Sequence, residues 1–192
     1  MASTYDVIDD PLKEWIGHQH VFFVATAPLA ASGHVNVSPK GGDTLRVLGP
    51  REVAYLDGSG SGIETISHVR ENGRIVIMLC AFDGSPRIVR FHGRGEIIDA
   101  GDDRFTQYLG RFSRYPTARS VVRVDVDRIS DSCGYGVPFM DFVGDRRETA
   151  NYVAKAPDRA IRDYLQKHNR ASIDGIPALA PEIIDRVVIQ RP

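Results

Sequence analysis

Cysteine is scarce in this sequence, and long apolar runs are missing altogether. The two cysteines, Cys80 and Cys133, stand far apart, and neither belongs to a Cys or Cys/His cluster with metal-ligand spacing. We therefore expect neither a structural disulfide nor a metal site. No segment approaches the roughly 20 apolar residues that cross a bilayer, and the N-terminus lacks the basic and apolar regions of a signal peptide. The sequence predicts a soluble, cytoplasmic protein with no membrane partner.

An excess of charge of one sign is also missing. The 192 residues include 24 Lys plus Arg and 25 Asp plus Glu, which gives a formal net charge of -1. Such a balance provides no field that would attract nucleic acid, so no nucleic-acid partner is expected. The length suits one well-filled domain. A single core is therefore the default expectation.

Glycine, by contrast, is concentrated in one place. An apolar stretch at 53–56 leads into residues 57–62, Asp-Gly-Ser-Gly-Ser-Gly, and then into a helical pattern at 63–72. The glycines allow backbone N–H groups to turn inward, Ser59 and Ser61 add hydroxyl donors, and the first turn of a helix has unsatisfied N–H groups. This arrangement favours a negative charge. It predicts a cradle for a phosphate-bearing ligand.

Two other interpretations of the loop have to be weighed. Ser61 could be the N-cap of the helix, with Glu64 completing a capping box, and this use needs the same donors as phosphate binding. The motif alone does not decide between the two. A dinucleotide-binding fold fits poorly, because the glycines run G-x-G-x-G and crossover helices are missing. A Walker loop is excluded, since no Gly-Lys-Ser or Gly-Lys-Thr follows.

The remaining pattern predicts a succession of short antiparallel strands with helices around them. Gly93 and Gly95 inside one strand suggest a bulge or a sharp bend. We expect strands at 20–27, 34–38, 45–48, 52–56, 74–82, 87–98 and 118–129, and helices at 11–17, 63–72, 102–112, 146–155 and 158–169.

Three stretches, residues 35–41, 53–65 and 86–95, carry a resemblance to a known family, and the loop at 132–138 extends it. The chain resembles the pyridoxamine 5'-phosphate oxidase-like family of FMN-binding split β-barrels. The resemblance implies a mainly β fold with flanking helices (α+β), built on a six-stranded antiparallel split β-barrel. The barrel would occupy residues 1–130, with a helical extension at 131–192 packed on the same domain. It also implies a homodimer with FMN in a groove shared by the subunits.

The resemblance also assigns roles to individual residues. Ser38 and Lys40 would lie beside the flavin ring or ribityl chain, and the positive charge of Arg90 would face the phosphate or the ribityl chain. The residues that would hold the phosphate are Ser59, Ser61, Gly62 and Thr65. A phosphate does need both oriented N–H donors and a cation, and the planar fork of arginine suits it. Arg87 and Arg90 lie on opposite faces of one expected strand, so at most one of them faces the ligand.

The implied function is that of an FMN-dependent oxidoreductase acting on an unidentified small substrate. The chain has no clear counterpart of the C-terminal arginine-containing segment that true pyridoxamine phosphate oxidases use, so oxidation of vitamin B6 is not expected. The alternatives are a non-catalytic FMN-binding or cofactor-carrier protein and a deazaflavin- or haem-binding relative. His92, on the same strand face as Arg90, is the candidate haem ligand in the last case.

Overall fold

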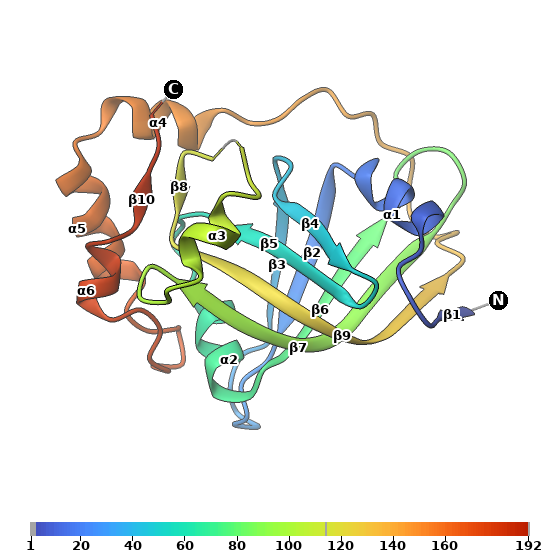
Figure 1. Ribbon diagram of the computed structural model, residues 1–192, viewed down its shortest axis with the longest axis horizontal. Coiled ribbons are helices and arrows are strands. Elements are labelled where there is room, and N and C mark those ends of the chain that lie inside the picture. Colours follow the sequence, from blue (N-terminus) through green and yellow to red (C-terminus); the bar gives the residue numbers. More distant parts are fainter. Residues whose placement is uncertain (1–2, 114, 192) are drawn as a thin grey trace.

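The fold is one curled antiparallel sheet with helices around it (Figure 1). The computed structural model describes residues 3–113 and 115–191. The strands are β1 Ser3–Tyr5, β2 Val21–Thr26, β3 Asn36–Gly41, β4 Leu45–Gly49, β5 Glu52–Asp57, β6 Arg74–Cys80, β7 Ile88–Asp99, β8 Thr117–Ala118, β9 Ser120–Ser132 and β10 Val188–Ile189. The helices are α1 Asp10–Gly17, α2 Glu64–Asn72, α3 Phe105–Leu109, α4 Glu148–Lys155, α5 Asp158–His168 and α6 Pro181–Ile184.

Over the described residues the main sheet has eight strands, in the order β3-β2-β6-β7-β9-β5-β4, with β1 paired to β9 off this path. The split barrel is thus confirmed, but the expected number of six strands is too low. The extra pairing arises because β9 is 13 residues long and runs past its neighbour β5. The part of β9 that extends beyond β5 pairs with β1 through Ile129 to Asp131. Three residues are too few for β1 to show an alternating pattern in the sequence.

The bulge expected near the glycines of β7 is present. The register of β7 against β9 shifts between His92 and Gly93. A Cβ atom at Gly93 would lie 2.1 Å from the carbonyl oxygen of Asp125, so only glycine allows the two backbones to approach this closely. The bulge increases the local bend of the sheet, which helps β7 and β9 to curl around the core.

The core has an inner and an outer part. Inside the curl, Val53 and Tyr55 of β5 pack in a cluster with Leu12 and Ile16 of α1. Pro11 stands in the first turn of α1, and Asp9 caps the helix by accepting the N–H of Leu12 at 2.9 Å. Outside the curl, the alternate residues of β5 pack against α3 and the turns around it. Buried on both faces, β5 is a rigid support for the loop that follows it.

The helix expected at 102–112 is shorter in the structure, where α3 spans Phe105–Leu109. The Asp102 carboxylate accepts the backbone N–H of Arg104 at 2.8 Å and forms a local turn there. Such side-chain bonds compete with helix formation for the same backbone donors. The expected start of the helix is therefore a turn.

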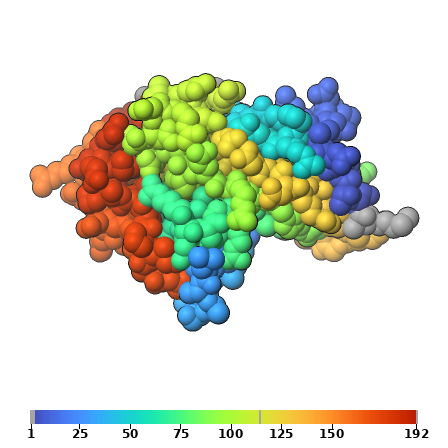
Figure 2. Space-filling view, turned by 60° about the horizontal axis from the view of Figure 1, so that its bottom comes forward, coloured from blue at the N-terminus to red at the C-terminus, as the bar shows by residue number. Residues whose placement is uncertain are grey.

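Beyond β9 the chain crosses the top of the barrel without a helix or strand until α4, and the helices α4, α5 and α6 then gather at one side (Figure 1). The apolar faces of these helices form a third cluster with Ile63 and Ile66 at the start of α2. The last strand, β10, pairs with β8. Figure 2 shows the C-terminal part lying directly against the segment that contains α2. Among the described residues, no helix is long and apolar enough to cross a membrane.

Candidate functional site

The glycine-rich loop joins the end of β5 to the start of α2, as the sequence predicts. The residue at the N-cap of α2 is Ile63, and within the described part of the chain no side chain caps the first turn. The capping box of Ser61 and Glu64 is therefore wrong. Ser61 is exposed on the loop, and the Glu64 carboxylate instead accepts the N–H of Ile173 at 3.3 Å. The first-turn N–H groups of α2 consequently stay open to a ligand.

A pocket of about 300 Å³ opens in front of this loop. Five of the residues that the sequence assigns to the cofactor line it, namely Ser38, Lys40, Ser59, Gly62 and Thr65. The other lining residues are Asn36, Pro39, Gly58, Gly60, Glu64 and Arg119. The edge strand β3 forms one wall and the loop with α2 forms the other, so residues about 20 positions apart in the sequence meet across it.

Two of the expected site residues do not line this pocket. Ser61 lies on the loop but is turned to solvent. Arg90 lies on β7 between Val89 and Phe91, which point into the inner core, so its side chain is on the other face of the sheet. There its Nη1 donates to Ser132 Oγ at 3.1 Å. In a single chain, Arg90 is therefore away from the glycine loop.

The guanidinium that the structure does bring to the pocket belongs to Arg119, which sequence analysis missed. Its side chain is buried, with 5 % of its surface exposed. Nε donates to Asp57 Oδ2 at 2.7 Å, and Nη1 donates to Asn169 Oδ1 at 2.7 Å. The residue stands between β8 and β9, where the chain changes strands. By strand alternation, Arg119 would share a face with Arg123, so the pattern gave no signal that it is buried.

Asp57 is the centre of a buried ionic network under the pocket. Its carboxylate forms an ion pair with Arg119 on one side. On the other side it accepts a hydrogen bond from Lys40 Nζ at 3.1 Å. Burial by itself raises the pKa of Asp57, but the charges of Arg119 and Lys40 and their hydrogen bonds outweigh it and lower the pKa to about 2. Asp57 is thus ionised at neutral pH. It holds both cations in place beside the pocket.

This network predicts a loss of stability in acid. The pKa of Asp57 falls from 3.8 to about 2 on folding. Its contribution, about 2 kcal/mol, is therefore complete above pH ~4 and is lost as the pH falls through the folded-state value. Urea unfolding between pH 5 and pH 2 should show a shallower pH dependence for Asp57→Asn than for wild type. The variant should also be less stable at pH 5, because Arg119 and Lys40 lose their partner. Equal pH slopes for the two proteins would contradict this role.

One residue that lines the pocket has a hydroxyl group with no partner among the described residues. Ser59 Oγ is buried and makes no hydrogen bond. The backbone N–H of Ser59 is fixed by Thr117 Oγ1 at 2.9 Å. Buried polar groups without partners are rare and need an explanation. The Ser59 hydroxyl is therefore a candidate donor for an acceptor-rich ligand in the pocket that this residue lines.

The positive charges at the pocket are partly cancelled by nearby carboxylates. Lys40 and Arg119 bring positive charge, but Asp57 neutralises part of it and Glu64 also lines the pocket. The attraction for an anion therefore depends less on net charge than on oriented donors from the loop, the helix start and the hydroxyls. A phosphate with three acceptor oxygens matches such a set of donors. The residues present fit a phosphorylated cofactor.

A second pocket of about 660 Å³ adjoins the first and shares Pro39, Lys40 and Gly58 with it. Its far wall is formed by residues 115–117 and by the segment around Gly144 that leads into α4. Lys40 stands where the two pockets meet. Together the two pockets have room for a ligand whose phosphate and ring system lie on different sides of this lysine.

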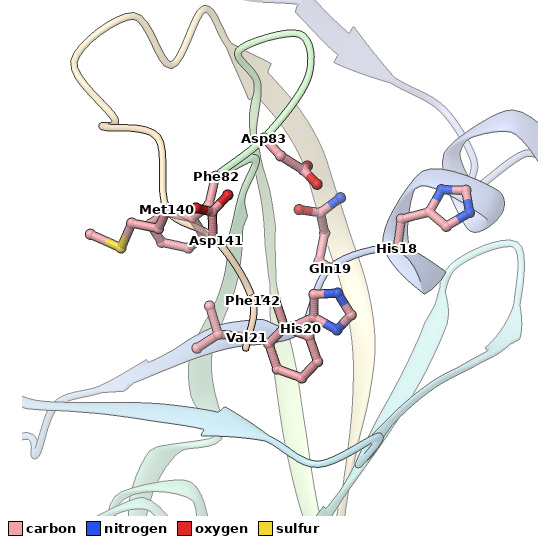
Figure 3. A pocket seen from close by; sticks show the side chains of 9 residues that line it. All are labelled: His18, Gln19, His20, Val21, Phe82, Asp83, Met140, Asp141 and Phe142. Atoms are coloured by element: carbon pink, nitrogen blue, oxygen red, sulfur yellow. The ribbon is translucent and has the colours of Figure 1, made fainter. Parts of the chain in front are cut away.

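The segment that walls the second pocket is fastened at a third, smaller pocket of about 220 Å³ (Figure 3). The rings of His20 and Phe142 stack there with centroids 3.6 Å apart and planes at 7°. The N–H of Met140 also donates to the carbonyl of Phe82 at 3.0 Å. These contacts place residues 140–142 over the start of β2. They fix the crossing segment close to the place where it enters the second pocket.

His92 lies on the same face of β7 as Arg90, as expected, and outside the pocket at the loop. Burial, together with the charges of Arg128 and Arg90, lowers its pKa. The imidazole is consequently neutral at pH 7. His92 therefore lies on the outer face of the sheet, away from the glycine loop.

The curled sheet and the cradle at the start of α2 together define a protein of the split-barrel class. Residues 8–133 match the family model described as Pyridoxamine 5'-phosphate oxidase. The chain is also 36 % identical over 203 residues to the pyridoxamine 5'-phosphate oxidase family protein ustO of Aspergillus flavus, covering 97 % of this chain and 81 % of that protein. This chain belongs to the pyridoxamine 5'-phosphate oxidase family.

A solved structure supports the fold. A single-substitution variant of HupZ from Group A Streptococcus superposes with a TM-score of 0.51 and is 24 % identical, over 65 % of this chain and 99 % of that one. At this level of identity the similarity concerns the fold alone. The superposition therefore supports the barrel, and the remaining third of this chain lies outside it.

Proposed function

We propose that the protein is an FMN-dependent oxidoreductase of the pyridoxamine 5'-phosphate oxidase-like type, which acts on a small molecule still to be identified. The observation that carries the proposal is the cradle, in which the glycine-rich loop with Ser59 and the start of α2, whose first turn no described side chain caps, line one pocket. The phosphate would bind there, and the ring system would extend past Lys40 into the adjoining pocket. When bound, the flavin supplies the redox chemistry, and the protein supplies binding, orientation and electrostatics.

The chain's own residues have separate tasks in this proposal. Ser59, Thr65 and the loop N–H groups hold the phosphate, while Ser38 lines the pocket from β3. Lys40 brings a positive charge to the junction of the two pockets, and Asp57 fixes its position. A fixed cation of this kind stabilises negative charge that develops on a bound ring. The buried Asp57 and Arg119 pair keeps the floor of the site rigid.

We further propose that the active form is a cytoplasmic homodimer with the cofactor at the subunit interface. Val35 and Val37, just before and on the edge strand β3, are 70 % and 61 % exposed. They flank Asn36, which lines the pocket. Exposed apolar side chains beside an unpaired strand edge favour contact with another protein surface. A second copy that covers them would close the pocket on its open side.

The spectrum of the purified protein and a titration with FMN test the proposal. Flavin absorption bands, or quenching of FMN fluorescence on binding, are expected. Reduction of the bound flavin by NADH or NADPH and turnover with an acceptor would establish an enzyme, whereas binding without turnover would indicate a carrier. Parallel titrations with a deazaflavin and with haem address the two remaining alternatives. A protein that binds no flavin in any of these assays would refute the proposal.

The hydroxyl of Ser59 should contribute measurably to FMN affinity. Ser59→Ala removes a buried donor of a residue that lines the pocket, so we expect binding about tenfold weaker, the effect of one hydrogen bond to a charged group. Ser85→Ala, in the exposed turn between β6 and β7, is the matched control and should bind FMN like wild type. Equilibrium titration of both variants gives the comparison. Equal affinities would remove Ser59 from the site.

A further inference from the structure

The C-terminal segment 169–178 lies behind the cradle and contacts it. Asn169, the C-cap residue of α5, is completely buried. Its Nδ2 donates to the carbonyl of Gly60 at 2.9 Å, and its Oδ1 accepts Nη1 of Arg119 at 2.7 Å. One amide group thus joins the glycine loop to the buried ionic network. Asn169 lies well beyond residue 133, where the match to the family model ends.

The same segment also holds α2, the other half of the cradle. Ser67 Oγ donates to the carbonyl of Ile176 at 3.0 Å, and Arg70 donates to the carbonyl of Ala178. The start of α2 is anchored by Ile63 and Ile66 in the cluster formed with α4, α5 and α6. The C-terminal helices are therefore part of the support of the cradle.

The loop itself has few other attachments. Within the described parts of the chain, only two side chains bond to the backbone of residues 58–62: Thr117 at the N–H of Ser59 and Asn169 at the carbonyl of Gly60. A Cβ atom at Gly60 would have no neighbour within 4 Å, so packing does not fix this residue. The conformation at Gly60 depends on the hydrogen bond from Asn169.

This bond has a consequence for the next donor of the loop. In a planar trans peptide the carbonyl and the following N–H point in opposite directions. Because the carbonyl of Gly60 points to the buried Asn169, the N–H of Ser61 points away from the protein interior. The N–H of Ser61 is thereby set on the outer side of the loop, between Gly60 and Gly62, which both line the pocket.

We propose that Asn169 is a positioning residue, which fixes the glycine loop in the conformation that binds phosphate. The proposal rests on the proposed function for the identity of the ligand, and the state of the loop can be measured without it. Losing the bond to Gly60 should free the loop and reduce the number of donors that are oriented before binding. Ordering them at the moment of binding then costs affinity.

Two variants separate the tasks of this amide. Asn169→Ala removes both hydrogen bonds. Asn169→Asp keeps an acceptor for Arg119 and loses the donor to Gly60. Gln166→Ala is the matched control, because Gln166 is an amide on the same helix whose Nε2 donates to the carbonyl of Pro181 at 3.0 Å, away from the loop.

The readouts are the backbone order parameters of residues 58–62 in the ligand-free protein and the dissociation constant for FMN. We expect order parameters of about 0.85, typical of a rigid backbone, in wild type and Gln166→Ala. In both Asn169 variants we expect order parameters below ~0.6. FMN should bind about tenfold more weakly to both Asn169 variants. Unfolding by urea identifies a variant that has lost its fold. If Asn169→Ala is unfolded, the order parameters and FMN affinity of Asn169→Asp test the proposal.

The inference and the proposed function can fail separately. If wild type does not bind FMN, the proposed function fails. The order parameters still test whether Asn169 fixes the conformation of the loop. Wild-type order parameters in the folded Asn169 variants would overturn the inference. So would unchanged FMN affinity in these variants when wild type binds FMN.

Discussion

Arg119→Ala should destabilise the protein by about 3 to 5 kcal/mol, the usual effect of removing one partner of a buried ion pair. Without the guanidinium, the carboxylate of Asp57 stays buried with Lys40 as its remaining cation, and Asn169 Oδ1 loses its donor. Arg119→Lys keeps the charge but cannot bond to both partners, so an intermediate loss is expected. Denaturant unfolding measures both effects. Arg159→Ala, on α5, is the control and should change stability by less than ~0.5 kcal/mol, because the Arg159 side chain is 92 % exposed.

FMN affinity of the same series distinguishes the two candidate cations. We expect Arg119→Lys, the milder substitution, to bind FMN clearly more weakly than wild type, because a lysine cannot bond to Asp57 and Asn169 at once. Arg90→Ala should bind nearly as well as wild type, because Arg90 contacts Ser132 on the outer face of the sheet. A large loss for Arg90→Ala would show instead that the outer face reaches a cofactor, as it could across a subunit contact. In the unfolding experiment, an Arg119→Ala variant as stable as wild type would contradict the buried network itself.

Gly93→Ala should cost on the order of 3 kcal/mol of unfolding free energy, since overpacking at a tight site forces the backbones apart. The new Cβ would lie 2.1 Å from the carbonyl oxygen of Asp125, and a backbone atom cannot rotate away as a side chain can. Thermal or urea unfolding measures the loss.

Gly17→Ala is the matched control for this substitution. Gly17 is the last residue of α1, and a Cβ there would have nothing within 4 Å. Alanine is favoured over glycine in a helix, so the control should be as stable as wild type or slightly more stable. If both variants were equally stable, the bulge of β7 would not need a glycine.

Local patterns in the sequence predicted most of the elements correctly. Alternating apolar residues identified the long strands, and the spacing of Ile63, Ile66 and Val69 together with Gly73 identified α2 and its end. Gly73 has φ of 70°, the left-handed conformation expected after a helix. These features depend on neighbours in the chain, which is why a single sequence contains them.

The site was predicted only in part because its floor is assembled from distant residues. Alternation shows that Arg87 and Arg90 point in opposite directions, but it does not tell which face of β7 is the inside. The same rule places Arg119 with the solvated residues of β9, whereas the change of strand before Ser120 buries it. Asn169 lies 109 positions from Gly60, and no local pattern connects the two.

The irregular stretch between β9 and α4 is a tether, and the attachment of the last helices does not depend on it. The apolar cluster with α2, the pairing of β10 with β8 and the contacts of segment 169–178 all hold the C-terminal third to the barrel independently of that covalent connection. A proteolytic cut in the tether would therefore leave a two-piece complex with its cradle assembled. For the same reason, the chain offers a natural position at which to split the protein into complementing fragments.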